Sequence, residues 1–204
     1  MSFNLFTAFI ITTVVLILLP GPNVALIVAN SVARGTRYGL ITVAGTSSAV
    51  VIQLTLTVLG MTTLMSVLAT WFEWVRWLGV VYLVYLGIKC WVAPAIDLSD
   101  TKAEGGAAHR IYLRGLLVSL TNPKTLLFLG AFLPQFVNTE SDPMGQLFLL
   151  AATFLIIAVS LDGVWALLGG RVRAMLKLKG RHINRLSGGL LIGAGMGLAL
   201  ARKP

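Results

Sequence analysis

The sequence predicts an all-α integral membrane protein with about six transmembrane helices, two of them broken by prolines. Of its 204 residues, 57% are hydrophobic and only 11% are charged, and the mean hydropathy is +0.89. Soluble domains carry about 25% charged residues, so this composition indicates a chain that is surrounded by lipid. Six helices of about 20 residues and their connections account for the chain, so we expect a single transmembrane domain over residues 1–204.

The first span is expected over residues 5–30 and is interrupted near its centre by Pro20, Gly21 and Pro22. Proline lacks a backbone donor and clashes with the preceding helical turn, so one helix should end near Pro20 and another should begin near Pro22. In a bilayer, such a break is tolerated only where it is buried in protein or lines a watery cavity. The break therefore indicates a binding site; a packing kink without a ligand is the alternative.

Spans 2 and 3 are expected over residues 39–68 and 75–92, joined by an interfacial turn at 71–77 that contains tryptophans. Span 2 carries small or polar residues at steps of three and four, which places them on one helical face that should look inward. Gln53 on that face either contacts a ligand or holds neighbouring helices together. The members of this stripe are Thr42, Thr46, Ala49, Gln53, Thr57 and Gly60.

The second break is expected at Asn122 and Pro123, within a fourth span over residues 111–137. The fifth span, over residues 144–168, places Asp162 in a stripe of mostly small residues. An intramembrane carboxyl group is a candidate for binding and releasing a proton; a structural pairing with a nearby basic group is the alternative.

A polar connection over residues 93–110 separates two expected half-repeats, about 1–92 and 111–201. The last span of the second half, over residues 186–201, has glycines at four-residue spacing, which permit close helix contact. Each half has three spans, an odd number, so a repeat must be inverted in the membrane. Each half also begins with a proline-broken helix, which is typical of inverted-repeat transporters whose site lies near the bilayer midplane.

The formal net charge of +9 comes from lysines and arginines that cluster between the hydrophobic spans. There they indicate membrane topology, and no nucleic-acid partner is expected. The connections after spans 1, 3 and 5 hold twelve basic residues when Lys89 and Arg114 are counted as snorkelling to the third connection, against three on the other side; Lys124 lies inside span 4. We therefore expect the basic side in the cytoplasm and both termini outside. Cys90 is the single cysteine, and His109 and His182 lie in polar connections, so neither a metal site nor a cofactor is expected.

Four motifs carry a resemblance to a known family. They are Pro20-Gly21-Pro22-Asn23 followed by Gly35 and Gly39, Tyr82-Leu83-Val84-Tyr85-Leu86-Gly87, Asn122-Pro123-Lys124 followed by Phe132-Leu133-Pro134-Gln135-Phe136, and Asn184-Arg185-Leu186-Ser187-Gly188. In these motifs the chain resembles the bacterial amino-acid exporters of the lysine exporter and homoserine/threonine efflux type (LysE/RhtB). The resemblance implies a six-span inner-membrane protein, a homodimer, that moves amino acids outward at the expense of the proton gradient. Many members carry an acidic or amide residue where this chain has Val50, which leaves Asp162 without a second intramembrane carboxylate.

The two breaks suit a zwitterionic substrate. Helices that restart after proline direct backbone donors and positive dipole ends at a carboxylate, and the carbonyl groups of the unwound segment suit an ammonium. Lys124 offers a charge to the substrate carboxylate or to Asp162; snorkelling toward an interface is the alternative. The candidate substrate-binding residues are Pro20, Gly21, Pro22, Asn23, Gln53, Asn122, Pro123 and Lys124, with Asp162 as the proton-coupling residue.

These features predict a secondary exporter of small, neutral amino acids similar to threonine or homoserine, working by proton antiport with alternating access. A dibasic substrate is disfavoured because its second cation would lack a partner. A membrane channel or an accessory subunit of a larger complex is the alternative. An intramembrane enzyme is less favoured, because the sequence has no G-x-S-x-G nucleophile motif and no intramembrane histidine. A phosphate-binding loop for ATP is also missing from the sequence.

Overall fold

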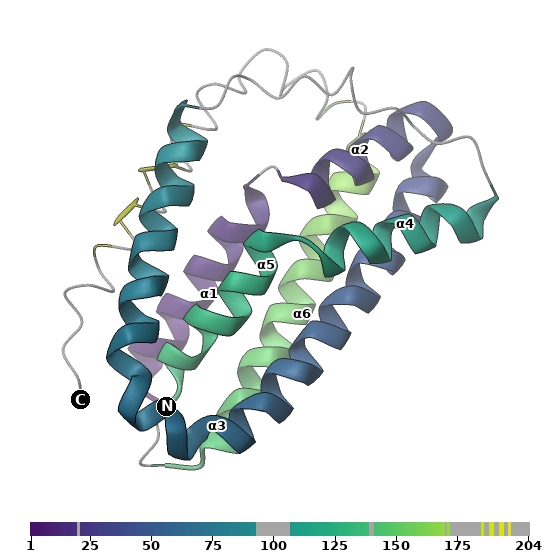
Figure 1. Cartoon of the computed structure of the whole chain (residues 1–204). Coiled ribbons are helices and arrows are strands. Elements are labelled where there is room, and N and C mark those ends of the chain that lie inside the picture. The colour runs from purple at the N-terminus through teal and green to yellow at the C-terminus, as the bar shows by residue number, and fades with distance from the viewer. Residues whose placement is uncertain are drawn as a thin grey trace.

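The computed structural model describes residues 1–19, 21–92, 107–138 and 141–169, together with isolated positions from 171 to 196. Every regular element within these residues is a helix (Figure 1), so the predicted all-helical architecture is confirmed. The elements are α1 (Phe3–Leu18), α2 (Pro22–Arg34), α3 (Thr36–Val92), α4 (Ala108–Leu120), α5 (Pro123–Leu127), the π-helix η1 (Phe128–Phe132), the 3₁₀ helix η2 (Leu133–Phe136) and α6 (Pro143–Leu167).

The first predicted break separates α1 from α2, whose axes differ in direction by 52°. Pro22 is the first residue of α2, a position where the missing N–H is not needed and the fixed φ suits a helix. The helix α2 ends at Gly35, which has a φ of 95°, a left-handed conformation that favours glycine. Pro20 itself lies outside the described residues.

The second predicted break separates α4 from the segment that begins with α5, at an angle of 44°. Asn122 Oδ1 accepts a hydrogen bond of 3.1 Å from the backbone N–H of Lys124 and so caps α5. Beyond α5 the chain changes to a π-helical turn and then to a 3₁₀ turn. Pro134 explains the change, because it has no N–H to donate to the carbonyl group one α-helical turn before it.

The helix α3 differs from the prediction. We expected two spans joined by an interfacial turn at 71–77, but the helical backbone is continuous over Thr36–Val92. The chain between residues 61 and 78 contains neither proline nor glycine, so no residue there interrupts helical hydrogen bonding. Figure 1 shows that α3 nevertheless turns back on itself near the bottom of the view, and its two arms flank the molecule.

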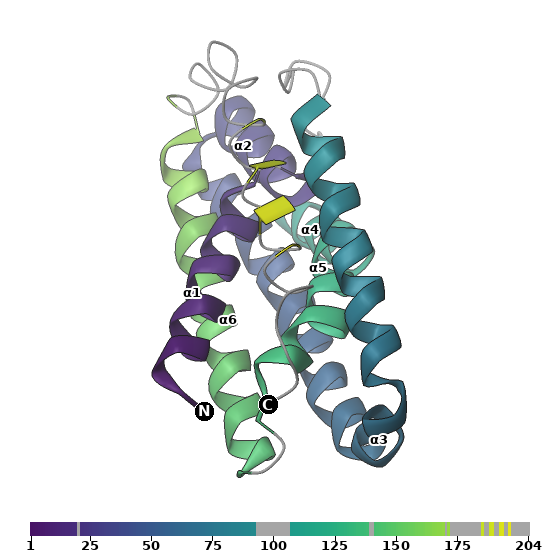
Figure 2. The same ribbon diagram turned by 90° about the vertical axis from the view of Figure 1, so that its left-hand side faces the viewer.

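A cluster of phenylalanine rings packs α1, η1, η2 and α6 together, and Figure 2 shows α1 running beside α6. The ring centroids of Phe9 and Phe136 are 5.2 Å apart, and those of Phe128 and Phe154 are 5.6 Å apart. These separations are typical of favourable aromatic pairs. Burial of these rings holds α1, which precedes the first break, against η1 and η2, which follow the second break.

Large apolar side chains cover the outside of the molecule, as a lipid environment requires. Leu56 on α3 and Ile156 on α6 are each 65% exposed, and the segments Thr36–Gly60 and Pro143–Leu167 are long and apolar enough to cross a bilayer. Within the described part of the chain there are up to four such spans when each bent pair counts as one. The prediction of an integral membrane protein is confirmed.

The sixth predicted span and the polar connection over 93–110 lie largely outside the described residues. Of the last span, Gly188 packs directly on α3: an added Cβ there would lie 2.9 Å from the backbone nitrogen of Trp91. A Cβ on Gly87 would in turn lie 2.8 Å from the carbonyl oxygen of Gly188. The predicted series was Gly189, Gly193 and Gly197. A Cβ on Gly189 would lie 3.2 Å from Trp91 Cζ3, whereas one on Gly193 would meet no atom within 4 Å, and Gly197 lies outside the described residues.

Candidate functional site

The two breaks lie side by side at the centre of the structure. Asn122 Nδ2 donates a hydrogen bond of 3.2 Å to Asn23 Oδ1, although the two residues are 99 positions apart in the chain. Asn23 Nδ2 donates in turn to Ser119 Oγ at 3.1 Å. Asn122 and Ser119 are both buried. The side chains next to one proline break are therefore bonded directly to those next to the other.

Gln53 connects α3 to the second break. Its Nε2 donates to the backbone carbonyls of Ser119 and Leu120, at 3.0 and 3.3 Å. These belong to the last turn of α4, where helical partners run out because the helix ends at Leu120. Gln53 is 4% exposed, and its Oε1 has no hydrogen-bond partner among the described residues. The side chain thus caps α4 and leaves a buried acceptor beside the break.

Lys124 connects the second break to the first. Its Nζ donates to the carbonyl oxygens of Leu16 and Leu19, both at 2.9 Å. These carbonyls lie at the end of α1, so the ammonium occupies the negative end of the α1 dipole. A Cβ added to Gly21 would be 3.5 Å from the same Nζ. The lysine therefore points into the protein toward α1, and the snorkelling alternative does not describe this conformation.

Asp162 lies on the inward face of α6, at 7% exposure. Thr46 Oγ1 approaches Asp162 Oδ2 at 3.5 Å, and Ser119 Oγ donates to the Thr46 carbonyl at 3.3 Å. A continuous set of polar contacts thus runs from the two breaks, through Ser119 and Thr46, to Asp162.

The sequence predicted most of these positions but not the residues at the centre of the network. Ser119 was missed, although it lies four positions after Gly115, a spacing that marks close helix contacts in membranes. Asn30 was also missed; its Nδ2 donates to Thr42 Oγ1 at 2.9 Å within the protein interior. The inward stripe of α3 is confirmed at its first four members, Thr42, Thr46, Ala49 and Gln53, which are all buried.

Replacement of Gln53 by leucine is expected to destabilise the protein by about 1–3 kcal/mol, because two carbonyl groups of α4 lose their buried donor. Thermal unfolding of the purified protein in detergent measures this effect. Thr55→Leu is the matched control: Thr55 is exposed on the same helix and its hydroxyl bonds only to its own helix, at Val51 O. Equal losses in the two variants would show that Gln53 does not cap α4.

Two facing broken helices, a buried polar network between them and an apolar outer surface together define a membrane transport protein. The family model of the LysE type translocators matches residues 14–202, and the chain belongs to this family. The homoserine/homoserine lactone efflux protein of Salmonella typhimurium is 32% identical over 99% of both chains. An uncharacterized membrane protein of Vibrio cholerae is 31% identical over 99% of this chain and 100% of its own length.

A leucine efflux protein of Salmonella typhimurium is 34% identical over 72% of this chain and 70% of its own length. No solved structure is significantly similar to the chain. The comparisons confirm the predicted family and its class: the members are translocators of amino acids, and the protein is a transporter and not an enzyme.

Proposed function

We propose that this protein exports small, neutral amino acids across the bacterial inner membrane by proton antiport with alternating access. The observation that carries the proposal is the polar network between the breaks, which joins Asn23 and Asn122 to a buried carboxyl group at Asp162. Relatives named for the efflux of homoserine and of leucine support a neutral amino acid as the substrate. Threonine and homoserine are the favoured candidates.

The chemistry of the breaks supports a zwitterion. The helix α2 begins beside the network and has no side-chain cap, so its first N–H groups and positive dipole end are available to a substrate carboxylate. The helix α5 also begins there, with its first N–H capped by Asn122. The acceptor Gln53 Oε1 and the carbonyls at the end of α1 suit the substrate ammonium. Among the side chains that the structure describes, Asp162 is the buried carboxyl group. A second cationic charge on a dibasic substrate would therefore lack a partner there.

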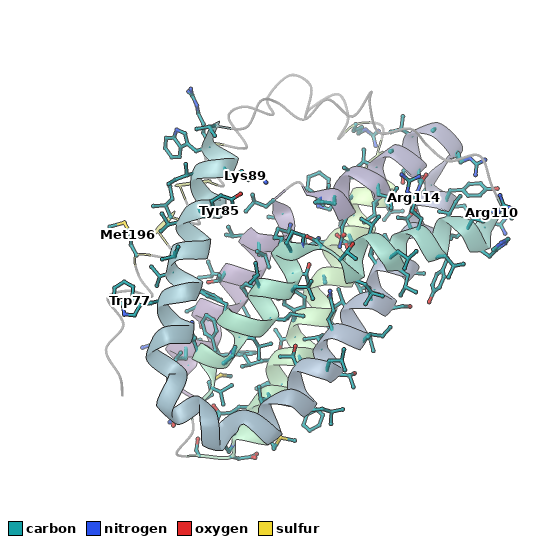
Figure 3. The ribbon with its side chains drawn as sticks, in the orientation of Figure 1. Trp77, Tyr85, Lys89, Arg110, Arg114 and Met196 are labelled. Atoms are coloured by element: carbon teal, nitrogen blue, oxygen red, sulfur yellow. The ribbon has the colours of Figure 1, made fainter. Side chains whose placement is uncertain are left out.

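For orientation, we propose that the basic connections face the cytoplasm and that the termini lie outside, with the protein acting as a homodimer. Figure 3 shows Lys89, Arg110 and Arg114 toward the upper side of the view, as expected for residues that flank connections on one side of the membrane. A hollow of about 690 Å³ opens between the starts of α1 and α6, where Phe3 and Gln146 line it. On this orientation the hollow faces outward.

Purified protein in proteoliposomes tests the proposal. Labelled L-threonine, L-homoserine and L-leucine should each be tested for counterflow against the same unlabelled amino acid inside, with L-lysine as the comparison. We expect saturable counterflow of at least one neutral amino acid, stimulation of its net transport by a pH gradient, and weak transport of L-lysine. Flux that rises linearly without saturation would favour the channel, and preferred transport of L-lysine would contradict the neutral substrate.

A further inference from the structure

We propose that Lys124 is an internal substitute for the substrate ammonium: it occupies the carbonyl site at the end of α1 when no substrate is bound, and an arriving substrate displaces it toward Asp162. This inference rests on the proposed function, because it assumes an amino-acid substrate and a coupled proton. In this proposal Lys124 competes with the substrate ammonium for its site and does not bind the substrate carboxylate.

The geometry at the end of α1 carries the first step. The Lys124 Nζ makes two hydrogen bonds of 2.9 Å, to the carbonyl oxygens of Leu16 and Leu19, a distance typical of a charge-assisted bond. Exposed carbonyls of an interrupted helix are the groups that an unwound segment offers to a cation. In this conformation a protein ammonium fills that place, so a substrate ammonium can bind there only after Lys124 leaves.

The second step concerns where Lys124 goes. A displaced ammonium in the membrane interior needs a new partner. Among the described side chains Asp162 is the buried carboxyl group, and polar contacts through Ser119 and Thr46 link it to the break where Lys124 lies. The described elements packed against α6 are α1, α2 and α3. The helix α1 has no ionisable side chain, α2 has only Arg34 in its last turn, and the arm of α3 up to residue 72 has only Arg37 and Tyr38, both in its first turn.

The two steps together couple the substrate to the proton. When Lys124 reaches a protonated Asp162, the O–H bond of the carboxyl group breaks, the proton passes to water, and the resulting carboxylate pairs with the ammonium. Substrate binding therefore releases a proton, and protonation of Asp162 returns Lys124 to the α1 carbonyls and expels the substrate. Proton and substrate exclude each other through one mobile side chain, which is the condition for antiport.

A double-mutant cycle on substrate binding tests the proposal. The variants are Lys124→Met, Asp162→Asn and the double variant, and the probe is whichever of L-threonine, L-homoserine and L-leucine shows counterflow in the wild type. We expect Asp162→Asn to weaken binding about tenfold, or ~1.4 kcal/mol, because the displaced lysine loses its partner. Lys124→Met should bind at least as tightly as the wild type, and the double variant should recover wild-type binding.

A pH dye in weakly buffered detergent solution gives a second readout. Addition of the amino acid to the wild type should release protons, and neither single variant should do so. Loss of binding in Lys124→Met, additive losses in the double variant, or proton release that persists without Lys124 would each overturn the proposal. Failure of the wild type to bind any of the three amino acids would instead contradict the proposed function.

Lys124 also holds the two breaks together, so Lys124→Met needs a control for folding, given by its thermal unfolding curve. Where that variant does not fold, Lys124→Gln takes its place, because its neutral amide can still donate a hydrogen bond but carries no positive charge. The same results are expected for it. Wild-type binding and proton release in Asp162→Asn would overturn the proposal whether or not either lysine variant folds.

Discussion

Replacement of Asp162 by asparagine is expected to reduce strongly the stimulation of amino-acid efflux by a proton gradient. Asparagine has nearly the same shape and retains an oxygen for Thr46 Oγ1, but it cannot bind or release a proton. Coupling free energies between two ligands are typically 1–3 kcal/mol, so the stimulation should fall by about 5- to 150-fold. Exchange of external for internal amino acid needs no proton and should continue, with a raised half-saturation concentration.

The measurement is efflux of labelled substrate from proteoliposomes with and without a pH gradient. Asp142→Asn is the matched control, because it makes the same substitution just before the first turn of α6. Asp142 Oδ1 accepts from Gly145 N at 3.0 Å in a helix cap, and asparagine caps helices equally well. If Asp162→Asn responds to the gradient as strongly as Asp142→Asn does, Asp162 does not couple transport to the proton.

Replacement of Gly45 by alanine is expected to have a large effect on both stability and transport. The Cβ of an alanine there would overlap the backbone carbonyl of Tyr112 and would lie 3.0 Å from the backbone nitrogen of Leu116. These atoms belong to α4 and cannot rotate away, so α3 and α4 must move apart. Overpacking of this kind costs about 1–3 kcal/mol, and the movement also separates Ser119 from the Thr46 carbonyl. We therefore expect losses of both stability and transport.

Gly60→Ala is the control for this prediction, because it makes the same change in the same helix. An added Cβ at Gly60 meets no atom within 4 Å, and alanine favours the helix over glycine by about 1 kcal/mol. Thermal unfolding in detergent should show opposite signs for the two variants. A Gly45→Ala protein as stable as Gly60→Ala would mean that α3 and α4 do not approach this closely in the membrane.

The sequence predicted the parts of the site that depend on local chemistry. Prolines break helices wherever they occur in an apolar run, so the breaks beside Pro22 and Pro123 were evident without a structure. The inward stripe of α3 and the inward position of Asp162 follow from helical periodicity in the same way. The meeting of Asn23 with Asn122 followed only indirectly, from the proposed pairing of the two halves.

The parts that the sequence did not predict depend on distances between helices. Gly45 and Gly115 are two of many glycines, and only the close α3–α4 contact distinguishes them. The partner of Lys124 could not be predicted, because a long flexible side chain reaches several groups and the α1 carbonyls carry no sequence signal. The continuous helix α3 was missed because aromatic residues near an interface favoured a turn, whereas backbone hydrogen bonding continues through them.

Cross-linking across the two breaks tests the central claim most directly, which is that substrate binds where the broken helices meet. Asn23→Cys and Asn122→Cys are combined in a Cys90→Ser background, which removes the single native cysteine, and are treated with a short bifunctional thiol reagent. Asn23→Cys with Leu56→Cys is the control pair, because Leu56 faces outward. We predict that the first pair cross-links, that the amino-acid substrate slows the reaction, and that the cross-linked protein no longer transports. A cross-linked protein that transports at the uncross-linked rate, or a pair that does not react, would contradict the account.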